Sequence, residues 1–169
     1  MKTMTEFDDR VGRIQAAWRR ERPDLDVSPQ GVIGRLHRLA THLTAELEVV
    51  YARHGLSEGE FDVLATLRRA GDPFELAPSE LADQTMVTTG GMTKRLDRLE
   101  ARGLLSRRAA GGDGRRRVVA LTPRGVEAID AAFTDHMENE RRLLDQLGAS
   151  DARDLEGLLA RWLEHHEGD

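Results

Sequence analysis

The chain has 169 residues, of which 30 are acidic and 25 basic, giving a formal net charge of -5 at pH 7. This length suits one domain with helical extensions and is sufficient for a buried core. The sequence contains no cysteine, which excludes disulfides, thiolate metal sites and thiol-based redox sensing within the chain. No apolar run approaches the roughly 20 residues that span a bilayer, and the first residues do not resemble a signal peptide. We therefore expect a cytoplasmic protein without membrane contact.

The N-terminal part is predicted to form two amphipathic helices. In the first, over residues 5–21, four apolar side chains fall on one face at helical spacing. These side chains are Phe7, Val11, Ile14 and Trp18. Pro23 ends this helix, because the residue before a proline avoids the helical region. A second helix begins with Ser28 as its N-cap and ends near Gly55.

A third helix is predicted over residues 61–69. Ser57 and Glu60 have the spacing of a capping box, in which each side chain bonds to the backbone amide of the other residue. The run from Phe61 to Leu67 is apolar on nearly all sides. A helix of this kind should be central and buried.

The next segment has the pattern of a winged helix-turn-helix. A short helix starts at Pro78, and a second helix runs from about residue 88 to residue 102, where Gly103 ends it. Two short strands, 104–108 and 118–121, follow with a glycine-rich turn between them. A pair of helices beside a basic hairpin is typical of this DNA-binding unit.

Two more amphipathic helices complete the chain. The first begins with Thr122 as its N-cap, and a turn at residues 148–150 separates it from the second. A winged domain alone is too small to cover the apolar faces of the helices at both ends of the chain, whereas two copies packed together would bury them. We therefore predict a homodimer formed through helices 5–21 and 123–166, which places two reading heads about 34 Å apart on DNA.

The expected fold is mainly α with a small β-wing, a winged helix-turn-helix flanked by N- and C-terminal dimerisation helices. Residues 1–54 supply the N-terminal dimerisation helices, residues 55–122 the DNA-binding domain, and residues 123–169 the C-terminal dimerisation helices. Aromatic residues make up only 4% of the chain, so the core should consist mostly of leucine, valine and alanine.

Basic residues concentrate in the winged segment although the chain as a whole is acidic. Between Met86 and Arg124 there are ten lysine and arginine residues against three acidic ones, a local excess of +7. Such an excess in a protein of net charge -5 indicates a polyanionic partner at one site. Double-stranded DNA fits the helix-turn-helix pattern.

The second helix of this segment has a buried and an outward side. Met92, Leu96 and Leu99 share one side, whereas Lys94 and Arg98 lie opposite. Threonines and glycines at its start suit contacts with base edges and phosphates, and the arginines of the hairpin tip suit a narrow minor groove. The alternative is a solvated charged face. The residues that we predict to contact DNA are Ser79, Thr88, Thr89, Gly90, Gly91, Thr93, Lys94, Arg98, Asp113, Arg115, Arg116 and Arg117.

Three motifs of the winged segment resemble the MarR family (multiple antibiotic resistance regulators). They are Leu99-Glu100-Ala101-Arg102-Gly103-Leu104, Asp113-Gly114-Arg115 and Leu121-Thr122. Gly114 departs from the arginine that is common at its position, whereas Arg115 matches the arginine of the wing tip. The resemblance extends over nearly the whole chain, and it implies a dimeric DNA-binding transcriptional regulator.

A narrower resemblance is to the urate-responsive branch of that family. It is carried by Trp18, Pro23-Asp24-Leu25, Ser28-Pro29, the segment from Gly55 to Ala65 and the segment from Met92 to Glu100. That branch binds an anionic ligand with a tryptophan, a buried aspartate and two arginines. The matching positions here are Trp18, Asp62, Arg95 and Arg107. Lys94 departs from the asparagine usual in its segment. The resemblance implies a repressor that urate or a similar anion releases from DNA, with residues 1–54 as one wall of the pocket.

The sequence positions of the three charged residues are compatible with an inward direction. Asp62 lies on the helix expected to be buried, where a carboxylate needs a partner. Arg95 lies about 60° from Met92, on the shoulder of the buried side of its helix. Arg107 shares strand parity with Leu105, so it can turn toward the core. The alternative is two structural ion pairs and a packing tryptophan.

Other classes of function find less support in the sequence. The six histidines show no metal-ligand spacing and no phosphate-binding glycine loop is present, so we expect no enzyme activity, metal or cofactor. Two alternatives stay open: a MarR-type regulator that responds to another organic anion, and an architectural or protein-binding winged-helix protein without a small-molecule ligand. The acidic balance of the chain argues against an architectural DNA-binding protein, since such proteins are usually basic.

Overall fold

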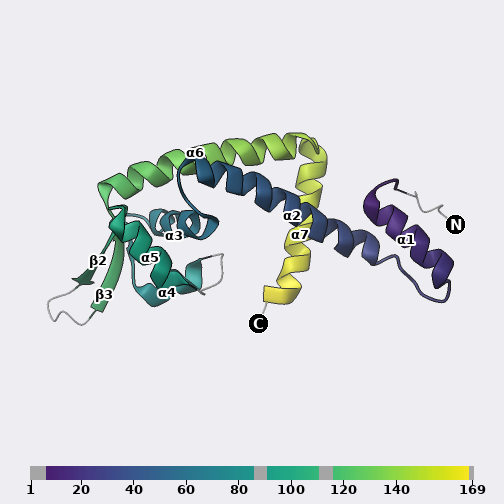
Figure 1. Ribbon diagram of the computed structural model, residues 1–169, viewed down its shortest axis with the longest axis horizontal. Coiled ribbons are helices and arrows are strands. Elements are labelled where there is room, and N and C mark those ends of the chain that lie inside the picture. Colours follow the sequence, from purple (N-terminus) through teal and green to yellow (C-terminus); the bar gives the residue numbers. More distant parts are fainter. Residues whose placement is uncertain (1–6, 86–90, 111–115, 168–169) are drawn as a thin grey trace. The chain divides into compact units, whose positions relative to one another are not determined.

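The computed structural model describes residues 7–85, 91–110 and 116–167, with the backbone alone at residues 110 and 116. It divides into two compact units, residues 1–46 and 47–169, and each is described by itself. Figure 1 shows their helices and strands. Helix α2 (Gln30–Arg53) contributes to both units.

The first unit consists of α1 (Arg10–Glu21) and the first part of α2. Asp9 is the N-cap of α1, and its carboxylate accepts a hydrogen bond from the Gly12 amide at 2.7 Å. The same carboxylate accepts a bond from Nε of Arg35 on α2, also at 2.7 Å. One acidic side chain therefore starts α1 and ties it to α2. The predicted helix is wrong at its N-terminal end, because the described residues before Asp9 are not helical.

The second unit is built around α3 (Glu58–Arg69). Ser57 Oγ accepts from the Glu60 amide at 3.3 Å and Glu60 Oε2 accepts from the Ser57 amide at 3.0 Å, so the predicted capping box is confirmed. The helix therefore starts directly after Ser57, which is earlier than predicted. Its fully enclosed side chains confirm the predicted central position; they are Val63, Leu64, Thr66 and Leu67.

The helix pair of the winged segment consists of α4 (Pro78–Gln84) and α5 (Met92–Ala101). Gly91 precedes α5 with φ of 83°, a left-handed conformation that glycine adopts without strain. The described part of α5 thus begins at Met92. The predicted start near residue 88 lies outside the described residues.

A small antiparallel sheet follows the helix pair. It contains β1 (Glu75–Leu76), β2 (Leu105–Ala110) and β3 (Arg116–Leu121), in the order β1-β3-β2. The pairing of β2 with β3, in which Arg107 lies opposite Val119, confirms the predicted hairpin. The sequence does not predict β1, since its two residues become a strand only through pairing with β3.

The core of the second unit is mostly aliphatic, as the composition predicts. Its largest fully buried side chains include Leu64, Leu67, Leu81, Leu99, Leu105 and Ile129. Each such leucine stabilises the fold by about 2 kcal/mol on leaving water. Three aromatic rings, those of Tyr51, Phe61 and Phe133, gather where α2 ends, and Tyr51 and Phe61 stack with ring centroids 4.3 Å apart.

Two long helices complete the second unit, α6 (Pro123–Asp145) and α7 (Ala149–Glu167). Figure 1 shows α6 running over α3, and Ile129 and Ala132 of α6 are buried in the core. Helix α7 has no buried side chain among its described residues. Its large apolar residues are exposed; they are Leu158, Leu159, Trp162 and Leu163. An apolar helix face thus stays uncovered in the single chain. Among the described residues, none of the helices has the length and hydropathy that a membrane crossing requires.

Candidate nucleic-acid interface

Helix α5 has the buried side that its sequence predicts. Met92, Leu96 and Leu99 are 9%, 4% and 0% exposed and join the core of the second unit. Thr93 and Lys94 are exposed in the first turn. Within the part of the chain that the structure describes, Lys94 has no ion-pair partner. Its ammonium group is therefore available to a phosphate.

The charged residues of α5 lie on two opposite flanks of its buried side. Arg95, Arg98 and Arg102 share the flank that faces the start of α3. Asp97 and Glu100 share the flank that faces β2. With about 100° of rotation per residue, Arg95 and Asp97 lie roughly 160° apart around the helix axis. The helix is thus held on one side through arginines and on the other through carboxylates.

The arginine flank contacts the first turn of α3 and the residues before it. Arg98 Nε donates to Glu60 Oε1 at 2.7 Å, and Arg102 Nη1 donates to the Gly55 carbonyl at 2.8 Å. Arg102 Nη1 also lies 3.9 Å from Glu60 Oε2. A Cβ atom placed on Gly59 would lie only 2.4 Å from Arg95 Nε, so the Arg95 side chain lies directly on the backbone of α3.

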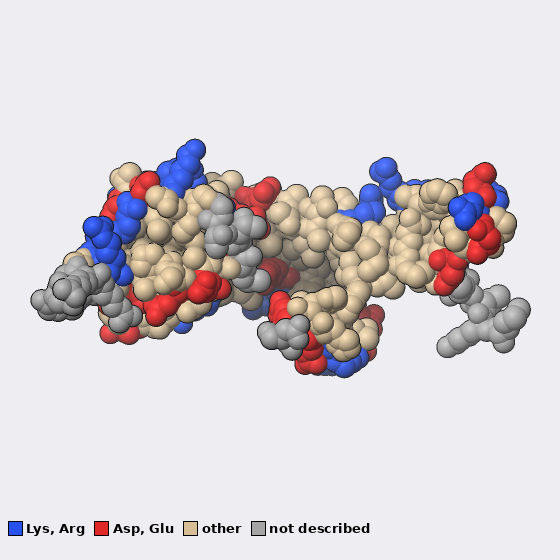
Figure 2. Space-filling view, turned by 90° about the horizontal axis from the view of Figure 1, so that it is seen from below, with Lys and Arg blue, Asp and Glu red and all other residues tan. Residues whose placement is uncertain are grey.

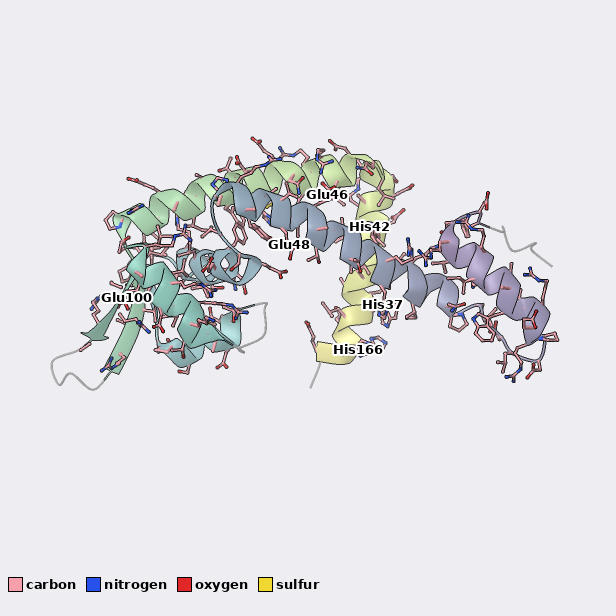
Figure 3. The ribbon with its side chains drawn as sticks, in the orientation of Figure 1. His37, His42, Glu46, Glu48, Glu100 and His166 are labelled. Carbon is pink, nitrogen blue, oxygen red and sulfur yellow. The ribbon has the colours of Figure 1, made fainter. Side chains whose placement is uncertain are left out.

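The carboxylate flank holds Arg107 of β2. Arg107 Nη2 lies 2.6 Å from Asp97 Oδ1 and 2.5 Å from Glu100 Oε2. The Arg107 amide also donates to Glu100 Oε1 at 3.0 Å, and Figure 3 labels Glu100 on this side of α5. Hydrogen bonds to Glu100 and then to Asp97 raise the pKa of Arg107, while the bonds from Arg107 lower the pKa of Glu100. The wing and the second helix are therefore tied by charge.

The predicted inward direction of Arg107 is wrong. Its side chain is 31% exposed and ends on the outer carboxylates of α5. Strand parity places Arg107 on the same side of β2 as Leu105, but two residues farther along the strand this side meets the rim of α5 rather than the core. The guanidinium bonds to the carboxylates of Asp97 and Glu100 at this rim. The structure therefore does not bring Arg107 to the arginine flank.

The other predicted ligand residues fall in different units. Asp62 is buried on α3, 8% exposed, as predicted. Arg95 is half-buried at the contact of α5 with Gly59, one helical turn before Asp62. Trp18 belongs to the first unit, where it is 48% exposed. Of the four, Arg95 thus lies at the α3–α5 contact, and Asp62 is buried on α3 three residues after Gly59. A crevice of about 270 Å³ between α6 and α7 is lined by none of the four.

The local positive charge is smaller than the sequence count indicates. Arg98 pairs with Glu60, and Arg108 pairs with Glu75 of β1. Both carboxylates lie outside the segment that gave an excess of +7, and including them lowers the excess to +5. Figure 2 shows both basic and acidic side chains over this face of the second unit. Much of the arginine charge is thus committed to internal contacts.

The remaining predicted DNA contacts differ in how far the structure describes them. Ser79 in the first turn of α4, Gly91 before α5 and Arg117 on β3 are exposed. Thr88, Thr89, Gly90, Asp113 and Arg115 lie outside the described residues, and Arg116 is described by its backbone alone. Sequence reasoning missed the role of Glu60 in holding Arg98. The capping-box spacing identified Glu60 only as part of the α3 cap.

The described residues contain no group of His, Asp or Glu side chains that could hold a metal ion. Two of the histidines make contacts between helices instead. His54 Nε2 lies 2.8 Å from Asp135 Oδ2, and His136 Nδ1 lies 3.4 Å from the Tyr51 hydroxyl. These contacts join the end of α2 to α6 within the second unit.

Comparison with known proteins identifies the winged unit. A sequence model of the MarR family matches residues 54–116. The HTH-type transcriptional regulator PecS of Dickeya dadantii (strain 3937) is 41% identical over 155 residues, which cover 92% of this chain and 93% of PecS. Further relatives in this comparison are also named as transcriptional regulators.

Solved structures agree with this likeness. A single-residue mutant of MarR from E. coli, crystallised with operator DNA, superposes with a TM-score of 0.68 at 26% identity, covering 82% of this chain and 99% of that one. BpsR of Bordetella bronchiseptica superposes with a TM-score of 0.67 at 21% identity, covering 79% of this chain and 93% of its own, a likeness that shows the fold. From the near full-length match to PecS and the winged helix-turn-helix of the second unit, the chain belongs to the MarR family and is a transcriptional regulator rather than an enzyme.

Proposed function

We propose that the protein is a ligand-released repressor that binds a pseudo-palindromic operator as a dimer. The observation that carries this proposal is the arrangement of α5. Its apolar side is buried, while Thr93 and Lys94 are exposed in its first turn. A recognition helix enters the major groove with such N-terminal residues. E. coli MarR, which shares the fold at 26% identity, was crystallised with operator DNA.

The uncovered apolar faces of the C-terminal helices support a dimer. Leu144 of α6 and Leu158 of α7 are 53% and 57% exposed, and Trp162 of α7 is 39% exposed. Exposed apolar stripes on long helices are costly in water and mark association sites. A second copy that packs helices 5–21 and 123–166 against their counterparts would cover them. Two-fold symmetry of the dimer then matches an operator with two half-sites.

The ligand of the proposed repressor is a small organic anion such as urate. It would contact Trp18, Asp62, Arg95 and Arg107. An anion near Arg95 would compete for its guanidinium and repel the buried Asp62 carboxylate. Because Arg95 belongs to α5, its movement would change the position of the helix that reads DNA. Arg107 would join the pocket only after leaving Asp97 and Glu100.

Another organic anion is the alternative to urate. BpsR, which shares the fold, has its DNA binding regulated by 6-hydroxynicotinic acid. Both compounds are planar, nitrogen-containing acids, and arginines bind such groups through paired hydrogen bonds. We therefore treat the two as separate probes of the same arginine-containing contact.

A DNA-binding titration tests the proposal. The protein is titrated onto a fragment of the promoter region upstream of its own gene and onto unrelated DNA of the same length. We expect tighter binding to the promoter fragment, weakening by urate, and loss of the urate response in Arg95→Ala. A typical coupling of about 1–3 kcal/mol corresponds to a weakening of tenfold or more. Equal affinity for both fragments would reject the repressor, whereas unchanged promoter affinity in millimolar urate would reject urate alone.

A further inference from the structure

Glu60 is a buried carboxylate whose two oxygens are both engaged. Its side chain is 8% exposed. Oε1 accepts from Arg98 Nε at 2.7 Å, and Oε2 accepts from the Ser57 amide at 3.0 Å. Burial by itself raises the pKa of Glu60, but the bonds from Ser57 and Arg98 outweigh it and hold the pKa below its usual range. Glu60 is therefore an ionised carboxylate at neutral pH.

The bond to Glu60 fixes one edge of the Arg98 guanidinium. Arg98 uses Nε for this contact, and its side chain is 48% exposed. Because the guanidinium is planar, anchoring Nε sets the plane in which the two terminal nitrogens lie. Within the described residues, those nitrogens make no hydrogen bond. They are left with four N–H groups for a partner outside the chain.

Arg98 lies on a flank of α5 rather than at the centre of its outward side. On the helical wheel Arg98 lies about 120° from Met92, whereas Lys94 lies about 160° from it. When a helix enters a groove, its flanks face the phosphate backbones that border the groove. A flank arginine with a fixed guanidinium plane is suited to a phosphate oxygen.

We propose that Glu60 is a positioning residue for DNA binding, which orients Arg98 so that its terminal nitrogens meet a DNA phosphate. The inference rests on the proposed function, because it requires α5 to lie in a groove. Orienting an arginine before binding removes rotamer freedom that would otherwise be lost on contact with DNA. In the opposite role, Glu60 would compete with DNA for Arg98. That role predicts that removing the Glu60 charge strengthens DNA binding, and the test distinguishes the two.

A double-mutant cycle on promoter DNA tests the inference. The four proteins are the wild type, Glu60→Gln, Arg98→Ala and the double variant. Glutamine is accepted at this capping-box position, so Glu60→Gln keeps the α3 cap while removing the charge. Replacing the charge-assisted bond by a neutral one should weaken promoter binding about fivefold. In the Arg98→Ala background the same substitution should cause no loss.

Ser57→Ala is the matched control for helix capping. It removes the hydroxyl that accepts from the Glu60 amide at 3.3 Å and leaves Glu60 with Arg98. We expect a lower melting temperature and unchanged promoter affinity. If Ser57→Ala weakened promoter binding as much as Glu60→Gln does, the effect would come from α3 and the inference would be overturned.

Two results of the cycle would also overturn the inference. Tighter promoter binding by Glu60→Gln would show that Glu60 competes with DNA for Arg98. An equal loss in the Arg98→Ala background would show that Glu60 acts through another residue. Either result leaves the repressor proposal intact, since both require the wild type to bind its promoter.

Nuclear magnetic resonance of the arginine Nε–H groups provides a measurement without DNA. In the free wild type we expect a slowly exchanging Arg98 signal, which Glu60→Gln speeds by about tenfold because the bond loses its charge. A rapidly exchanging wild-type signal would overturn the positioning even if promoter binding were normal. If the slow signal is present but the wild type does not prefer its promoter, the proposed function fails, and the role of Glu60 in DNA binding fails with it.

Discussion

Gly59→Ala tests two properties at once: the stability of α3 and the position of the Arg95 side chain on it. A Cβ atom at this position would lie 2.4 Å from Arg95 Nε and 2.8 Å from Arg95 Cζ. Ordinary contact begins near 3.4 Å, so the guanidinium must move by about 1 Å. The atoms in the way belong to the end of a flexible side chain rather than to backbone. We therefore expect α3 to accept alanine and Arg95 to leave its position on the helix.

The expected effect on stability is small and favourable. Alanine in place of a helical glycine stabilises by about 0.5–1 kcal/mol, which opposes the cost of moving Arg95 off the α3 backbone. The melting temperature, measured at fixed protein concentration, should rise by a few degrees or stay unchanged. In a titration with urate or 6-hydroxynicotinic acid, the same variant should need a higher concentration of acid to release promoter DNA, since Arg95 has been displaced.

Gly157→Ala on α7 is the matched control, because its nearest atom is Arg161 Nη1 at 3.5 Å. Gly157→Ala should give a similar gain in melting temperature. It should release promoter DNA at the same concentration of urate or 6-hydroxynicotinic acid as the wild type. A fall in stability of more than about 2 kcal/mol in Gly59→Ala would show that Arg95 cannot move from α3. If Gly59→Ala released promoter DNA at the same concentration of urate or 6-hydroxynicotinic acid as the wild type, the position of Arg95 on α3 would not matter for release of DNA.

Lys94→Ala should weaken binding to promoter and unrelated DNA alike, because an exposed lysine contributes one phosphate contact. The slope of log affinity against log salt concentration should become shallower by about 0.9. Salt titrations of the wild type and the variant measure this slope. Arg107→Ala should reduce the loss of stability in acid. The pKa of Glu100 is lowered from 4.5 by Arg107, so this pair stabilises the fold above about pH 4.5 and stops doing so as the pH falls through the lowered folded value. Melting temperatures between about pH 3 and about pH 6 compare the two proteins, and an identical pH dependence would contradict a role for the Glu100 pair.

The helices could be predicted from the sequence because their signals are local. The capping box of Ser57 and Glu60 and the apolar run after it are local to one helix, and they located α3 except for its start, which lies three residues earlier than predicted. Strand β1 could not be predicted, since nothing in Glu75 and Leu76 distinguishes them from a loop until Ala120 and Val119 pair with them. Propensity is a weak guide for so short an element.

The contacts of the charged residues could be predicted only in part. The burial of Asp62 followed from the apolar residues on both sides of it. The pairing of Arg98 with Glu60 joins residues 38 positions apart, and helical spacing contains no information on such a contact. Arg107 shows the same limit. Strand parity predicts the side of the sheet on which its side chain lies, but not whether the guanidinium reaches the core or bonds to carboxylates at the rim.

The two flanks of α5 explain how one ligand could act on DNA binding without contacting DNA. The first turn of α3 meets Arg95 at Gly59 and holds Arg98 through Glu60. Helix α5 has only 10 described residues, so a force on Arg95 moves the whole helix rather than bending it. The opposite flank is bonded to Arg107, which makes β2 follow the same movement. In the proposed mechanism, a ligand that pulls on Arg95 strongly enough to shift α5 would therefore move the recognition helix and the wing together, and so alter both DNA contacts of a reading head.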